Sequence, residues 1–123
     1  MRMTFLTLSL AVGAGLLTSQ AMAAENRCGW VQNPTPGNYW LDDRDGSWTI
    51  LTQGSDLEPD GIDNMPDFSA GPFVKTNGYY GYACACMSVE TDKAEMRITE
   101  IRSVKQLPLS KCKNDRTLPK PEG

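Results

Sequence analysis

Four cysteines are the residues whose chemistry most restricts this 123-residue chain: Cys28, Cys84, Cys86 and Cys112. A redox-active Cys-x-Cys pair needs an exposed thiolate beside a cation or a helix amino terminus, and no adjacent residue provides one. A four-thiolate zinc site is also disfavoured, because the paired Cys-x2-Cys spacing is absent. We therefore expect two disulfides, each typically worth about 2–4 kcal/mol to a small exported domain.

The spacing Cys84-Ala85-Cys86 restricts how these disulfides pair, although four cysteines allow three connectivities in principle. If the segment is a strand, both sulfurs point to the same face, and a direct bond between them would close a strained ring. We therefore expect Cys28 to pair with one of the two and Cys112 with the other. The sequence leaves open which one each takes.

Acid–base chemistry has few candidates, because the chain contains no histidine. Asp43 and Asp45 flank a predicted turn, and glycosidases use two carboxyl groups about 5–9.5 Å apart. Clustered aspartates at a turn more often accept hydrogen bonds from backbone amides. We expect no enzyme activity, no catalytic residue and no cofactor, and glycoside hydrolysis is the third of three functional hypotheses.

One acidic segment has oxygen-bearing residues at the spacing of a calcium loop: Asp56, Glu58, Asp60, Asn64 and Asp67. Pro59 and Pro66 stiffen the segment, and Asp67 is shorter than the usual bidentate glutamate. These features favour a solvated acidic loop, so no metal ligand is assigned. Calcium binding is kept as an alternative.

Aromatic residues are the other candidates for binding, since exposed rings can hold a glycan or anchor a protein partner. We expect Trp40 and Trp48 to point inward beside a disulfide. The adjacent Tyr79 and Tyr80 must face opposite ways on a strand, so one of them is a surface candidate. The predicted binding residues are Tyr79, Tyr80, Asp56, Glu58 and Asp60.

Residues 1–23 have the pattern of an export signal, with an early cation at Arg2, an apolar run over residues 5–17 and the cleavage pattern Ala21-Met22-Ala23. This run is shorter than the ~20 apolar residues that span a bilayer. We expect a single mature domain of residues 24–123, without membrane insertion, in the periplasm or the medium. Its net charge of −4 disfavours nucleic acid as a partner.

Strand and turn signals alternate along the mature chain. Aromatic and β-branched residues at 39–41 and 47–51 predict a β-hairpin, because the turn-forming Asp43-Arg44-Asp45-Gly46 lies between them. Asn77-Gly78 predicts a second tight turn. A central strand at 79–89 follows, and it forms another hairpin with residues 96–101.

The segments between these strands predict irregular structure. Residues 33–38 contain two prolines and a glycine and predict a loop, and residues 52–72 predict a long surface loop. Residues 107–112 have room for one helical turn, and a frayed tail is expected from about residue 117. The predicted fold is mainly β, a small antiparallel meander or partly open barrel stapled by two disulfides.

Five segments together resemble one known family: Arg27-Cys28-Gly29-Trp30, Asn33-Pro34-Thr35-Pro36-Gly37-Asn38, Asp43-Arg44-Asp45-Gly46-Ser47-Trp48, Gly81-Tyr82-Ala83-Cys84-Ala85-Cys86 and Leu109-Ser110-Lys111-Cys112. The chain is similar to the bacterial domain of unknown function 4087 family over essentially its whole mature length. The resemblance implies a small exported protein. It implies no activity and no catalytic residue.

The first functional hypothesis is an exported, non-enzymatic binding protein of the bacterial envelope, such as an inhibitor or immunity-type partner of another exported protein. It rests on small size, export, disulfide rigidity and the missing catalytic groups. The alternative is a small-ligand module that binds calcium or an envelope glycan. The sequence leaves the partner and the oligomeric state open.

Overall fold

The computed structural model describes residues 11, 13, 15 and 24–121, so the predicted export signal lies almost entirely outside the described residues. The described residues 24–121 form a β domain with short helical turns. Its elements are β1 (Glu25–Thr35), β2 (Asn38–Asp43), β3 (Gly46–Leu51), the 3-10 turns η1 (Ile62–Asn64) and η2 (Phe68–Ala70), β4 (Val74–Asn77), β5 (Tyr80–Asp92), β6 (Arg97–Leu107) and α1 (Leu109–Lys113).

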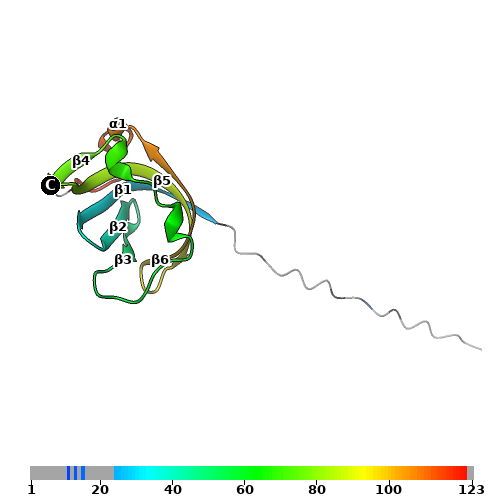
Figure 1. Cartoon of the computed structure of the whole chain (residues 1–123). Helices are drawn as coiled ribbons and strands as arrows, with labels where there is room; N and C mark the ends of the chain where they lie inside the picture. The colour runs from blue at the N-terminus through cyan, green and yellow to red at the C-terminus, as the bar shows by residue number, and fades with distance from the viewer. Residues whose placement is uncertain (1–10, 12, 14, 16–23, 122–123) are drawn as a thin grey trace, which may run out of the picture.

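All six strands belong to one sheet in the order β1-β2-β3-β6-β5-β4, and β1 also pairs with β5, so the hydrogen bonding runs round in a ring (Figure 1). The mainly β prediction is confirmed. The sheet is mixed rather than purely antiparallel, because β3 meets β6 in parallel at the single pair Thr49 and Arg97. This short contact is the weakest part of the ring.

The predicted hairpins are confirmed. Asp43 pairs with Gly46 at the β2–β3 turn, and Asn77 pairs with Tyr80 at the β4–β5 turn. Asp92 and Arg97 pair at the start of the third hairpin, β5–β6. The sequence thus predicts the β2–β3 and β5–β6 hairpins and the tight turn at Asn77-Gly78, but it does not predict strand β4, which completes the remaining hairpin.

The loop predicted at residues 33–38 is wrong, because β1 runs to Thr35 and β2 begins at Asn38. The β1–β2 register shifts between Gln32 and Thr35, and this irregularity tolerates Pro34, which has no backbone donor. The Asn33 amide donates to the carbonyls of Thr35 and Asn38 at 2.9 and 2.8 Å. These side-chain hydrogen bonds take the place of ladder hydrogen bonds at the irregularity. The sequence pattern does not predict them.

The core lies inside the ring, where alternating residues of the strands meet. Its buried members are Val31, Leu41, Trp48, Ile50, Phe68, Ala83, Ala85, Met87, Val89, Ile98 and Ile101. A second, smaller cluster lies on the outer face under α1, where Trp30, Cys84 and Cys112 are buried against Leu109 and Leu118. β1 and β5 are therefore covered on both faces.

The long segment between β3 and β4 lies along the edge of β6 that β3 leaves largely unpaired. The amide of Asp60 donates to the Thr99 carbonyl at 3.0 Å, and the Ile101 amide donates to the Asp60 carbonyl at 2.8 Å. Further along, the Gln106 side chain donates to the carbonyls of Phe68 and Pro72. The loop thus forms hydrogen bonds along a strand edge whose backbone amides and carbonyls would otherwise be unpaired.

Both expected disulfides form, and the structure decides their pairing. Cys28 bonds to Cys86, joining β1 to β5, and Cys84 bonds to Cys112, joining β5 to α1. Each member of the Cys-x-Cys pair therefore takes a distant partner, as expected. Two disulfides are typical of proteins that fold outside the cytosol.

The carboxyl-terminal residues lie against the domain, in contrast to the frayed tail expected from about residue 117. Leu118 packs on the outer cluster, and its amide donates to the Asp115 carbonyl at 3.3 Å. The second disulfide holds the preceding helix in place and so positions this segment. Among the described residues, no helix is long and apolar enough to span a membrane.

Candidate functional site

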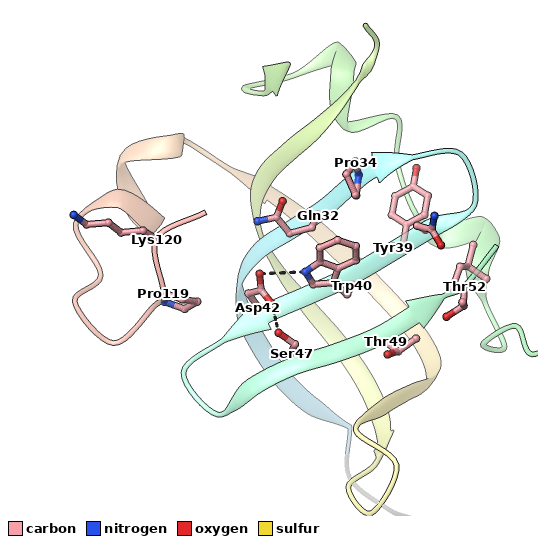
Figure 2. Close-up of a pocket in the computed structure, with 12 residues that line it drawn as sticks. Gln32, Pro34, Tyr39, Trp40, Asp42, Ser47, Thr49, Thr52, Pro119 and Lys120 are labelled. Carbon is pink, nitrogen blue, oxygen red and sulfur yellow. Dashed lines mark hydrogen bonds between the residues drawn. The ribbon is translucent and has the colours of Figure 1, made fainter. Parts of the chain in front are cut away.

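A groove of about 760 Å³ lies on the outer face of β1, β2 and β3 (Figure 2). Pro119 and Lys120 of the carboxyl-terminal segment form one wall, and the floor is made of strand residues around Trp40. This volume is within the range of about 300–1,000 Å³ typical of ligand sites.

Strand register places Trp40 in this groove. The two-residue turn at Arg44 and Asp45 pairs Leu41 with Trp48, and both of these residues are buried in the core. Trp40 therefore faces outward, between Gln32 of β1 and Thr49 of β3. The prediction that Trp40 points inward is wrong, and Trp48, which is buried, contacts Arg27 rather than a disulfide.

Asp42 presents a half-buried carboxylate to the same groove. Its Oδ2 accepts a hydrogen bond from Trp40 Nε1 at 3.2 Å, and its Oδ1 accepts one from the Ser47 hydroxyl (Figure 2). Within the described chain, no lysine or arginine lies within ion-pair distance of Asp42. The carboxylate therefore keeps lone pairs for a further donor, while it fixes the orientation of the indole.

Gln32 is the most unusual polar residue of the groove. It is only 4% exposed and lines the groove beside Trp40, and its side-chain amide makes no hydrogen bond to other described residues. Its amide atoms keep access to the groove, because no fully buried side-chain nitrogen or oxygen among the described residues lacks a hydrogen-bond partner. The small accessible part of Gln32 therefore has donors and an acceptor available to a ligand.

Tyr39 lines both the groove and a small neighbouring cleft. Asp67, Phe73 and Tyr79 also line this cleft. Burial raises the pKa of Tyr39, and the nearby Tyr80 and Asp67 raise it further. Tyr39 therefore stays a neutral hydrogen-bonding phenol at physiological pH.

The predicted binding residues do not form one patch. Tyr79 is 81% exposed at the β4–β5 turn, and Tyr80 is half-buried at the start of β5. Asp60 lies beside Glu100, whose partner on β5 is Glu90, ten residues beyond Tyr80. The acid near the tyrosines is Asp67, at the end of the loop rather than its beginning.

The calcium-like spacing is used for backbone contacts. Asn64 donates its amide to the Ile101 carbonyl at 2.9 Å, and Asp67 accepts from the amide of Ser69 at 3.1 Å. Asp56 and Glu58 are both exposed. Within the residues that the structure describes, no three acidic, cysteine or histidine side chains come together as a metal site.

The acid pair at the β2–β3 turn also has a structural environment. Asp43 Oδ1 accepts hydrogen bonds from the amides of Asp45 and Gly46, as turn aspartates commonly do, and from Trp48 Nε1 at 2.9 Å. Its other oxygen accepts from Arg27 at 2.8 Å, and Arg27 also binds Glu25 and Asp45. Burial lowers the pKa of Arg27, but these hydrogen bonds outweigh it and raise the pKa overall.

The ring-like sheet, the two disulfides and the surface groove define a small, disulfide-linked β domain. The chain belongs to the family described as protein of unknown function (DUF4087), whose model matches residues 22–119. The resemblance stated from its motifs is thus confirmed. No curated protein and no solved structure matches the chain.

Sequence reasoning missed Gln32 and Trp40 as neighbours in a site. The length of the β2–β3 turn was the available signal for Trp40, because a two-residue turn sets the register that puts Trp48 and Trp40 on opposite faces. The sequence carries no local signal for Gln32 or for the wall at Pro119 and Lys120. Their positions depend on contacts between distant segments.

Proposed function

We propose that this protein is a non-enzymatic binding protein that acts in the bacterial periplasm or medium, and that the groove over β1–β3 is its binding site. The observation that carries the proposal is Gln32, whose amide lies at the groove floor, keeps access to the groove and makes no hydrogen bond to other described residues. A ligand in the groove can therefore hydrogen-bond to this amide without breaking a hydrogen bond within the protein.

The composition of the groove supports binding rather than catalysis. Asp42 is the only acid that lines it, whereas glycoside hydrolysis uses two carboxyl groups across a cleft. Asp43, the other candidate acid, is held by Arg27 and by the turn amides. With no histidine in the chain, the usual general base is also missing.

The export signal and the disulfides support a location outside the cytosol. Residues 1–23 have the composition of a cleaved export signal, and both cysteine pairs are bonded. The ligand is therefore sought among components of the envelope or the medium.

The test compares two variants of the mature protein, each immobilised and exposed to an extract of the producing cell's envelope. Trp40→Ala removes the floor of the groove, while Tyr79→Ala removes an exposed ring at the β4–β5 turn. We expect Trp40→Ala to lose the retained component and Tyr79→Ala to keep it. Equal retention by Trp40→Ala and the wild type would overturn the assignment of the groove.

A protein partner is a second candidate, as expected for an inhibitor or immunity-type protein. The observation that favours it is Tyr79, whose ring is 81% exposed and lies 5.5 Å from the Lys75 amine. Tyrosine is enriched in protein interfaces relative to the rest of the surface. In that case Tyr79→Ala loses a captured protein, and Trp40→Ala retains it.

A further inference from the structure

We infer that the groove binds carbohydrate, in the form of a short chain of sugar rings stacked on Trp40 and hydrogen-bonded by Gln32 and Asp42. This inference rests on the proposed function and names its ligand class.

The polar groups of the groove match hydroxyls, which both donate and accept. Asp42 can only accept, and the Gln32 amide both donates and accepts. Asp42 and Gln32 both lie on the side of Trp40 that carries the indole nitrogen (Figure 2). Neighbouring hydroxyls on one sugar ring satisfy donors and acceptors arranged in this way, and a purely anionic or cationic ligand satisfies only part of them.

Trp40 supplies the apolar surface that the C–H face of a sugar ring requires. Its Nε1 is engaged by Asp42 at 3.2 Å, so the edge of the ring is occupied and its orientation is set before any ligand arrives. In Figure 2 the indole lies across the strands between Gln32 and Thr49. A preorganised aromatic ring loses little side-chain entropy on binding.

The surrounding strands disfavour a peptide at this place. Peptides that add to a sheet need a free strand edge, but β2, which forms the floor around Trp40, is paired on both sides by β1 and β3. The groove therefore offers side chains and not backbone. Nucleic acid is disfavoured by the half-buried Asp42 carboxylate, which repels phosphates.

The experiment titrates the mature protein with cellotetraose, chitotetraose, maltotetraose and the peptide-free disaccharide of peptidoglycan, each to millimolar concentration. Tryptophan fluorescence reports on the groove, because Trp30 and Trp48 are only 1% and 2% exposed while Trp40 is half-buried. Calorimetry gives the affinity. We expect at least one of these sugars to bind and to change the Trp40 signal.

Variants locate the sugar. We expect Trp40→Ala, Gln32→Met and Asp42→Asn each to weaken binding by about tenfold or more, and Trp40→Phe to keep part of the affinity because it keeps a stacking ring. Leu57→Ala is the matched control, since it removes an exposed apolar side chain outside the groove. It leaves the affinity unchanged. Melting temperatures of all variants establish that they are folded.

The outcomes separate the two proposals. If none of the four sugars binds but an envelope component is still retained in a Trp40-dependent way, the carbohydrate inference is overturned and the groove remains a binding site. If the free stem peptide of peptidoglycan binds instead, the ligand is a peptide. If neither sugars nor extract components depend on Trp40, both proposals fail.

Discussion

Arg27 and Asp43 form a buried ion pair at the turn end of the β2–β3 hairpin, with Nη1 of Arg27 donating to Oδ2 of Asp43 at 2.8 Å. Their side chains are 10% and 2% exposed. The guanidinium also lies 3.9 Å from the centre of the Trp48 ring. Arg27 thereby links β1 to the hairpin that carries Trp40 and Asp42.

Replacing Arg27 with methionine leaves Asp43 buried without a cation. We expect Arg27→Met to lower the free energy of unfolding by about 3 kcal/mol, because breaking a buried pair strands the remaining charge. Urea unfolding followed by circular dichroism measures the change. Arg44→Met on the exposed turn is the control and shifts stability by less than about 0.5 kcal/mol. Equal effects of the two variants would show that the pair contributes nothing.

The variant Gln32→Met tests whether the Gln32 side chain serves ligand binding or the stability of the fold. We expect Gln32→Met to change the free energy of unfolding by less than about 0.5 kcal/mol, since it keeps the volume and removes no hydrogen bond within the described chain. The same variant weakens ligand binding in the groove. Denaturant titrations measure the first effect and calorimetry the second. A less stable variant would indicate that the amide has a structural role instead.

Glu90 and Glu100 form a directly opposed, half-buried pair on β5 and β6, and Arg102 donates to Glu90 at 2.7 Å. Hydrogen bonding to Glu90 raises the pKa of Glu100, while hydrogen bonds from Glu100 and Arg102 lower the pKa of Glu90. Carboxyl resonances in an NMR titration are expected to show Glu100 above its ordinary pKa and Glu90 below it. The reverse order would contradict this arrangement.

The two glutamates act on stability with opposite signs. The contribution of Glu90, whose pKa is lowered, is present above the unfolded pKa and is lost as pH falls through its folded pKa. The contribution of Glu100, whose pKa is raised, is present below the unfolded pKa and is lost as pH rises through its folded pKa. Glu100→Gln is therefore expected to gain stability relative to the wild type as pH rises through that value. Glu95→Gln in the exposed turn, the control, shows no such gain.

The Cys84–Cys112 disulfide holds α1 and, through it, the groove wall at Pro119 and Lys120. Replacing both cysteines with alanine is expected to lower stability by about 2–4 kcal/mol and to speed hydrogen exchange in residues 109–113. The matched variant lacks Cys28–Cys86, which joins two strands that are already paired. It is expected to keep the protection of α1. Equal exchange in both variants would show that packing alone holds the helix.

The sequence alone determined the local features of this protein. Turn residues and β-type runs predicted two hairpins and the tight turn at Asn77-Gly78, and the alternation of side chains along a strand put Cys84 and Cys86 on one face, so that each bonds to a distant partner. These features depend on neighbours within a few residues. That is why pattern and spacing were sufficient for them.

The tertiary structure decided which cysteine bonds to which, and where the groove lies. Cys28 reaches Cys86 because the β1–β5 register places them opposite each other, and that register is set by pairing between residues 58 apart in the chain. Gln32, Trp40 and Lys120 meet for the same reason, since β1, β2 and the carboxyl-terminal segment come together only when the ring closes. Contacts between distant segments depend on the whole packed core, which no local pattern encodes.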